Sequence, residues 1–252
     1  MAHAIVVAAL GGLLIGSFLN VVAYRLPRGE SLVTPGSRCP SCGNPVRSYD
    51  NVPVLSWLLL HGRCRDCGEP ISGRYAIVEA TTAALFVAVV AVRYEQTPQL
   101  VLGLVLVALL VPLALIDLDT RLLPNALTLP AAILAVVLGV GIDPGGQVER
   151  VVAGAAAGGF FLIAALLAPR GMGIGDVKLA AVLGLFLGRE VAVAVLVALL
   201  AGVAVGVAIV ARKGSAAGRK TAIPFGPFLA LGGVVGVLAG DVLVDAYHST
   251  LS

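Results

Sequence analysis

Two aspartates that lie far apart in the sequence are the side chains best suited to acid–base chemistry. Asp176 lies in the glycine-rich stretch GMGIGDVK (171–178), where the chain enters an apolar segment; Asp117 lies in ALIDLDTRLLPN (114–125), where another apolar segment ends. Ionisable groups near a membrane interior are costly and tend to mark function. Two carboxylates that meet can share a proton, so one draws a proton from water while the other polarises a peptide carbonyl. This pattern predicts an aspartic-protease pair.

The chain offers no rival catalytic set. Its three histidines are dispersed, without an HExxH motif or a Ser/His/Asp arrangement. Asp119 follows Asp117 by two positions, so on a helix it points to a different face and is interpreted as a solvated residue or a partner of Arg121. Lys178 is interpreted as a charge that extends to the membrane interface, or as a group that tunes the protonation of the pair.

The four cysteines form a second chemical cluster. They occur as CPSCG (39–43) and CRDCG (64–68), and thiolates at this spacing close on one metal ion from a tight turn. Two such turns supply the four ligands of a tetrahedral zinc site, which leaves no open position for a substrate, so the site is predicted to be structural. Disulfides are the alternative, but they do not persist in a reducing cytoplasm. The predicted ligands are Cys39, Cys42, Cys64 and Cys67.

The rest of the chain is built to cross a membrane. Hydrophobic residues make up 59% of it, charged residues only 12%, and the mean hydropathy is +1.01. A spanning helix needs about 20 predominantly apolar residues, and such runs recur along nearly the whole chain. We therefore predict an all-α polytopic membrane protein with about eight transmembrane helices. The expected segments are roughly 4–24, 76–92, 99–116, 125–141, 151–168, 177–188, 191–210 and 225–244.

These segments suggest three parts. Residues 1–24 are the first transmembrane helix, residues 25–75 are a small hydrophilic zinc-knuckle domain, and residues 76–252 are a seven-helix membrane domain that carries both aspartates. The first segment is interpreted as a retained helix, because its basic residues follow it, unlike those of a cleaved signal peptide. Its Gly12 and Gly16 have GxxxG spacing, which is typical of a close packing face; a pocket is the alternative.

The distribution of charge predicts the orientation. With eight spans and the N-terminus outside, only three of the 17 Lys and Arg residues fall outside, namely Arg93, Arg150 and Arg189. This follows the positive-inside rule and places Asp117 and Asp176 together at the cytoplasmic face. The basic residues are scattered over loops without a dense patch, so we expect membrane lipid around the chain and no nucleic-acid partner.

The combined motifs resemble those of the bacterial type IV prepilin peptidases, bifunctional leader peptidase/N-methyltransferases with a GxGD aspartic-protease core. The resemblance covers nearly the whole chain. It is carried by GSFLNVVAYRLP (16–27), the cysteine-containing stretch through residue 79, IDLDTRLLPNALTLP (116–130) and GMGIGDVK (171–178).

The resemblance implies that Asp117 and Asp176 are the catalytic pair, in a bacterial inner-membrane enzyme whose active site faces the cytoplasm. Its substrates would be type IV prepilins or pilin-like proteins, cut after a glycine and then N-methylated with S-adenosyl-L-methionine. No glycine-rich Rossmann signature marks a cofactor site, and Asn20 and Glu79 are the candidates for cofactor binding.

The chain departs from the family pattern at two positions. Asn125 stands where many members carry aspartate, which favours Asp117 as the partner of Asp176, and Ala76 stands where proline is common. Two alternative functions stay open. One is a GxGD protease without methylation; the other is a transporter or channel with an acidic cation site, although the aspartates lie at one interface rather than at the midplane.

Overall fold

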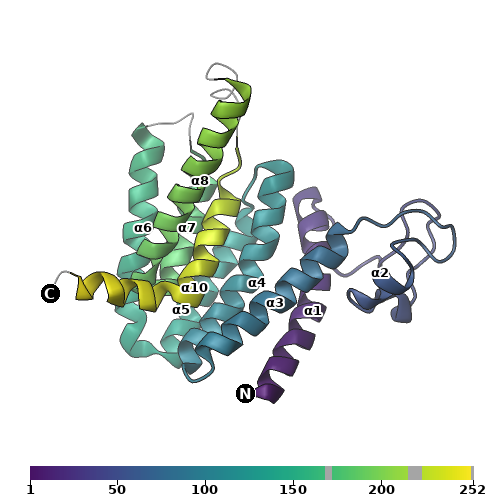
Figure 1. The fold of residues 1–252 in the computed structure, drawn as a ribbon, viewed down its shortest axis with the longest axis horizontal. Helices are drawn as coiled ribbons and strands as arrows, with labels where there is room; N and C mark the ends of the chain where they lie inside the picture. The colour runs from purple at the N-terminus through teal and green to yellow at the C-terminus, as the bar shows by residue number, and fades with distance from the viewer. Residues whose placement is uncertain (168–171, 215–222, 251–252) are drawn as a thin grey trace. The chain divides into compact units, whose positions relative to one another are not determined.

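The computed structural model describes residues 1–167, 172–214 and 223–250, and within these ranges the regular elements are helices, without a strand (Figure 1). The chain divides into two compact units, Met1–Tyr94 and Glu95–Ser252. The predicted all-α membrane fold is confirmed, and each predicted apolar segment corresponds to a helix. Residue 168, the predicted end of the fifth segment, lies outside the described ranges.

The Met1–Tyr94 unit contains two long helices, α1 (Ala2–Arg25) and α3 (Arg74–Arg93), which pack against each other. A Cβ atom added to Gly12 would lie 2.6 Å from Ala83 Cα, so the two backbones touch without side chains between them. The GxxxG spacing of α1 therefore forms the predicted packing face. Residues 26–73, hereafter the four-cysteine segment, join the two helices. This segment contains short helices at Leu26–Arg28 (η1), Ser48–Asn51 (η2) and Leu55–Leu59 (α2).

The Glu95–Ser252 unit is a bundle of helices. In it α6 packs on α7, α10 packs on α8 and α4, and α5 packs on α7. Its centre is filled by leucine and phenylalanine side chains that are almost fully buried, among them Leu110, Leu183 and Phe161. The long helices are α4 (Thr97–Thr120), α5 (Asn125–Ile142), α6 (Gln147–Leu167), α7 (Ile174–Leu187), α8 (Val191–Lys213) and α10 (Gly226–Ser249).

The connection between α7 and α8 is the weakest boundary in the sequence, because only Arg189 and Glu190 separate two apolar runs. In the structure a short turn, η4 (Gly188–Glu190), breaks the helix, and Gly188 has a φ of 63°. A carboxylate oxygen of Glu149 accepts a hydrogen bond from the Arg189 N–H at 2.9 Å. The chain therefore reverses here, and α7 and α8 are separate helices.

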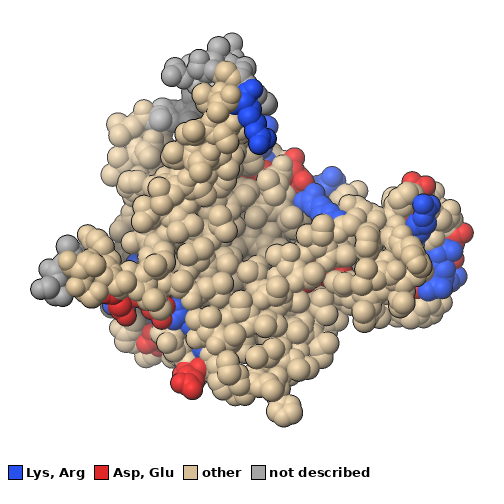
Figure 2. All heavy atoms as spheres, in the orientation of Figure 1, with Lys and Arg blue, Asp and Glu red and all other residues tan. Residues whose placement is uncertain are grey.

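Length and composition identify seven stretches of the described chain as able to cross a membrane; one of them, Ile174–Arg212, contains both α7 and α8. Its 39 residues would extend about 58 Å as one helix, roughly twice the thickness of a hydrocarbon core. Many large apolar side chains on the outer faces of the helices are exposed. On the side drawn in Figure 2, most of the surface over the long helices carries no Lys, Arg, Asp or Glu atoms, as expected for a multi-pass membrane protein.

Candidate active site

Asp117 lies in the last turn of α4 and is buried, with only 5% of its surface exposed, whereas Asp119 is exposed. The prediction that Asp119 points to a different face of the helix from Asp117 is confirmed. The backbone N–H of Gly226, at the start of α10, donates a hydrogen bond to Asp117 Oδ2 at 2.8 Å. A carboxylate at the end of one helix is thus held by the beginning of another.

Asp176 lies in the first turn of α7 and is 9% exposed. The N–H of Gly173, which precedes the helix, donates to Asp176 Oδ2 at 3.3 Å, so the side chain caps its own helix. Helix α4 contacts α7, and the carboxylates of Asp117 and Asp176 interact electrostatically. The structure therefore brings together, in one unit, the two acids that the sequence pairs.

The role of Gly226 could not be recognised from the sequence. The Gly-Pro step at 226–227 signals the start of a helix, because proline is favoured there, but it does not say what the helix start faces. A Cβ atom on Gly226 would lie 2.6 Å from Asp117 Oδ2, so the approach requires glycine. The signal that could have drawn attention is the stretch FGPF (225–228) at the start of an apolar segment.

The glycines that precede Asp176 differ from one another in what they do. Gly173 has φ −85° and ψ 148°, an extended conformation that any residue adopts. A Cβ atom on Gly175 would lie 2.9 Å from Leu123 Cβ, so this glycine allows α7 to approach the segment that follows Asp117. Gly171 lies outside the described residues. Close packing, rather than a turn, accounts for Gly175.

Two polar side chains flank this region. Arg121 ends α4 in the left-handed conformation, with φ 55°, and its charge acts on Asp117. Lys178 Nζ donates to Asn125 Oδ1 at 2.7 Å and so joins the beginning of α7 to the beginning of α5. The partner of Lys178 is therefore Asn125, the residue that stands where many members of the family carry aspartate.

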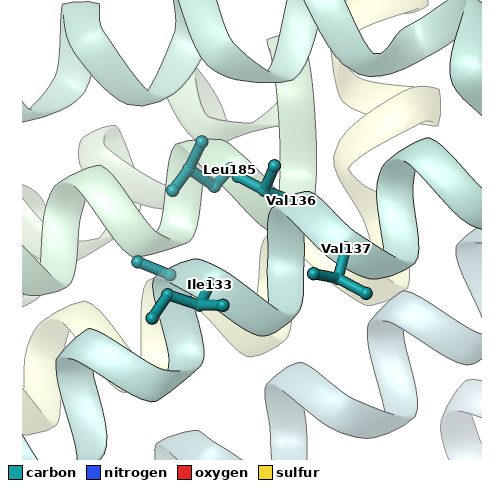
Figure 3. Close-up of a pocket in the computed structure, with 5 residues that line it drawn as sticks. Ile133, Val136, Val137 and Leu185 are labelled. Atoms are coloured by element: carbon teal, nitrogen blue, oxygen red, sulfur yellow. The ribbon is translucent and has the colours of Figure 1, made fainter.

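A shallow groove of about 340 Å³ lies between α5 and α7 on the apolar surface of the same unit. Figure 3 shows its lining: aliphatic side chains from both helices, with no acidic or basic group among them. The groove therefore contains nothing that could transfer a proton, and hydrolytic chemistry in this unit is better assigned to the carboxylates. The lining residues are Ala132, Ile133, Val136, Val137 and Leu185.

The four cysteines converge in the other unit, as predicted. Each pair forms the same turn: the Cys39 N–H donates to Asn44 O, the Cys64 N–H donates to Glu69 O, and the following glycines, Gly43 and Gly68, both have a φ of 74°. Left-handed backbone of this kind favours glycine. The bridges Arg38–Pro45 and Arg63–Pro70 close the two turns.

The four Sγ atoms lie within 4.8 Å of one another, and no disulfide joins them. The Sγ atoms of Cys39 and Cys67 are 3.8 Å apart. Four ligands at about 2.3 Å from a tetrahedral zinc ion would be separated by about 3.8 Å. The arrangement therefore fits a tetrahedral metal ion, and the residues that would hold it are the four predicted cysteines.

Polar contacts outside the cysteines also organise the four-cysteine segment. Arg65 donates to both carboxylate oxygens of Asp50, and Arg47 donates to Asp66 at 3.0 Å. The hydrogen bond from Arg65 holds the pKa of Asp50 below its usual value. These four charged residues place both signs on a small surface, and Figure 2 shows blue and red atoms gathered on this segment.

Asn20 and Glu79, the two candidates for cofactor binding, are both buried where α1 meets α3. Asn20 Nδ2 donates to the Tyr75 carbonyl at 3.2 Å, and Glu79 Oε2 accepts from the Val54 N–H at 2.7 Å. Val54 has a φ of 61°, which is rare for a β-branched residue. Asn20 thus joins α1 to the first turn of α3, and Glu79 joins α3 to the middle of the four-cysteine segment.

Comparison with known protein families divides the chain at nearly the same place as the structure does. Residues 10–93 match the family described as Bacterial Peptidase A24 N-terminal domain, and residues 104–209 match the Type IV leader peptidase family. The carboxylates at 117 and 176 lie within the second match, and the four cysteines lie within the first. No solved structure matched the chain.

Curated relatives cover most of the chain. A prepilin leader peptidase/N-methyltransferase of Neisseria gonorrhoeae is 38% identical over 270 residues, covering 94% of this chain and 91% of the relative. That of Aeromonas hydrophila is 37% identical over 268 residues with the same coverage. That of Myxococcus xanthus is 45% identical over 195 residues, 73% of this chain, and this chain spans 56% of its length. Similarity of this extent shows that the chain belongs to the family of prepilin leader peptidase/N-methyltransferases.

Proposed function

We propose that this protein cleaves the leader from type IV prepilins or pilin-like proteins and then methylates the new N-terminal residue. One observation supports the peptidase reaction above all: two buried aspartates, from α4 and α7, interact while each accepts a backbone N–H. Burial and fixed hydrogen bonds are what a pair that shares a proton requires. The relatives that share most of this chain bear the name of the same two activities.

The hydrolysis uses the two carboxylates in complementary states. The ionised member takes a proton from water as the water oxygen bonds to the peptide carbonyl carbon, and the protonated member gives its proton to the carbonyl oxygen. The resulting gem-diol then breaks its C–N bond. The amine leaves with the proton taken from water, and one hydroxyl returns a proton to the other carboxylate, which restores the pair.

The orientation follows from the charge distribution. We place the N-terminus of the chain outside and Asp117 with Asp176 at the cytoplasmic face of the inner membrane, as the positive-inside rule favours. A prepilin presents its cleavage site just before a hydrophobic helix, so a peptidase at this depth meets the peptide bond at the membrane surface. Residues 76–252 would then form the peptidase domain.

We assign the methyl-transfer function to the N-terminal part, with residues 25–75 as a structural zinc domain. The four thiolates supply a complete tetrahedral shell, so zinc would stabilise the fold of this segment rather than bind a substrate. S-adenosyl-L-methionine is the methyl donor that the activity implies. Asn20 and Glu79 are the candidates for binding it; Asn20 would also hold α1 to α3 through Tyr75, and Glu79 would hold the four-cysteine segment to α3 through Val54.

Co-expression with a prepilin tests the proposal. Membranes that contain the wild-type protein are expected to convert the prepilin to a shorter form, whereas Asp117→Ala and Asp176→Ala leave it uncut; Asp119→Ala, from the exposed face of α4, is the matched control. Normal processing by either of the first two variants would end the peptidase assignment. The mass of the mature N-terminus then decides between methylation and a peptidase that lacks it.

The remaining alternative, a channel or transporter with an acidic cation site, has its own test. Reconstituted vesicles would show an ion flux that is lost in Asp176→Asn. The placement of both carboxylates at helix ends, rather than in the middle of a span, favours the peptidase.

A further inference from the structure

The two aspartates differ in their surroundings although they resemble each other in the sequence. Asp117 accepts a short hydrogen bond, 2.8 Å, from a residue 109 positions away, and the charge of Arg121 acts on it favourably. Asp176 accepts a longer hydrogen bond, 3.3 Å, from the residue that precedes its own helix. The ionised form is therefore better supported at Asp117 than at Asp176.

The donor to Asp117 is placed by the packing of α10. Gly226 is the first residue of this 24-residue helix, and Pro227, the next residue, has no N–H of its own. Backbone N–H groups at a helix start lack partners within the helix and carry a partial positive charge, so they favour an anion. The rings of Phe225 and Phe161 lie 5.8 Å apart, which fixes the start of α10 against α6.

We propose that the backbone N–H of Gly226 is a positioning group that keeps Asp117 as the ionised member of the pair. Asp117 is then the general base that takes the proton of water, and Asp176 is the acid that donates to the carbonyl oxygen. The inference rests on the proposed peptidase function and deepens it. Among the residues that the structure describes, the other charged groups near Asp117 are Asp119 and Arg121 at the end of its own helix and Asp176 at the start of α7; α5 has no titratable residue, and α10 has none near its start.

Gly226→Ala tests the proposal, because the added Cβ atom would lie 2.6 Å from Asp117 Oδ2 and force the N–H and the carboxylate apart. Loss of one charge-assisted hydrogen bond is expected to lower kcat for prepilin cleavage about 10- to 100-fold with little change in KM. The acid limb of the pH–rate profile, which reports the base of the pair, is expected to move to higher pH. Gly206→Ala on α8 is the matched control, since a Cβ atom there has nothing within 4 Å.

A purely structural role of Gly226 would lower the folded fraction and the cleavage rate together and leave the shape of the pH profile unchanged. That result, or a normal rate in Gly226→Ala, overturns the proposal. Failure of the wild-type protein to cleave prepilin would instead overturn the proposed function. The unfolding temperature and helical circular dichroism of the solubilised variant report whether the Glu95–Ser252 unit is still folded.

Infrared difference spectroscopy keeps the proposal testable if Gly226→Ala does not fold. The reference is the variant that carries both Asp117→Asn and Asp176→Asn. Subtracting its spectrum from that of Asp176→Asn leaves the bands of Asp117, and subtracting it from that of Asp117→Asn leaves the bands of Asp176. Asp117 is expected to show the bands of an ionised carboxylate at a pH at which Asp176 shows those of a carboxylic acid. The opposite order would exchange the roles of base and acid and refute the inference.

Discussion

The Met1–Tyr94 and Glu95–Ser252 units position their reactive side chains by different means. In the first unit they lie on a long hydrophilic connection, where the order comes from two glycine turns, four thiols and a few ion pairs. In the second unit they lie at the ends of helices, where the order comes from the packing of apolar segments against one another.

This difference has consequences for stability. A connection with few buried side chains would depend on a metal ion bound by its four thiols for much of its folding energy. Helix ends in a bundle depend instead on close contacts between backbones, which small residues allow and larger residues disturb. Perturbations that are severe in one unit should therefore leave the other nearly unchanged.

Removal of the metal should have the largest effect, and it should be confined to the first unit. Binding of structural zinc contributes on the order of 10 kcal/mol to the folding of such segments. We expect Cys42→Ser combined with Cys67→Ser, or treatment with a strong chelator, to make the four-cysteine segment sensitive to protease and to abolish methylation. Helical circular dichroism of the solubilised protein should stay close to that of the wild type. Ser41→Ala, inside the first turn but not a ligand, is the control, and protection of the segment after chelation would contradict the metal assignment.

A larger residue in the α6–α7 interface should have the next largest effect, this time on the second unit. A Cβ atom at Gly184 would lie 2.5 Å from Gly154 Cα, so Gly184→Val must push two helix backbones apart. Overpacking of this kind costs about 1–3 kcal/mol. We expect a lower unfolding temperature in detergent and a loss of prepilin cleavage, with the zinc content unchanged.

Gly159→Val on α6 is the matched control for this experiment, because a Cβ atom there meets nothing within 4 Å. Equal destabilisation by both valine variants would show that the effect comes from valine in a helix and not from the interface.

An added charge near the carboxylates should have a smaller effect. In Asn125→Asp the Lys178 ammonium, now 2.7 Å from an amide oxygen, would instead face a carboxylate. An exposed ion pair of this kind contributes about 0–1 kcal/mol. We expect a slightly higher unfolding temperature and a cleavage rate within a few-fold of the wild type, with Lys178→Met abolishing the gain. A large loss of cleavage in Asn125→Asp would mean that the site requires a neutral residue at this position.

The smallest effect should come from the ion pairs of the four-cysteine segment. The guanidinium of Arg65 lowers the pKa of Asp50, so the pair stabilises the segment above the unfolded pKa of aspartate and the contribution is lost as pH falls through the lower, folded value. Because the Arg65 side chain is 46% exposed, water screens the pair and the effect is small. We expect Asp50→Asn to speed amide hydrogen exchange near this pair modestly at neutral pH, and to have no such effect in strong acid, below the folded pKa. A greater effect in acid would contradict this sign.

The sequence was sufficient for every feature that depends on local composition or spacing. Long apolar runs form helices in a membrane because each satisfies its own backbone hydrogen bonds, whatever its neighbours are. The spacing of Cys39 and Cys42 determines a turn that closes on one metal, and the second pair repeats it. The break between α7 and α8 was harder to predict, because it depends on three residues and on a contact from Glu149.

Features that depend on backbone contacts between distant segments could not be predicted. The sequence identifies Asn20 and Glu79 as polar residues in apolar surroundings, but their partners are the Tyr75 carbonyl and the Val54 N–H, which have no signature in residue type. The same holds for Gly175, whose small size matters only because Leu123 lies against it.

The sequence by itself determined that this chain crosses the membrane repeatedly, that its four thiols come in two pairs with the spacing of metal ligands, and that Asp117 and Asp176 are the acids to consider. Only the tertiary structure decided that the start of α10 holds Asp117 while Asp176 caps its own helix. The physical reason is that every residue except proline carries a backbone N–H, so the partner of a given carboxylate is chosen by the packing of whole helices and not by the side chains nearby in sequence.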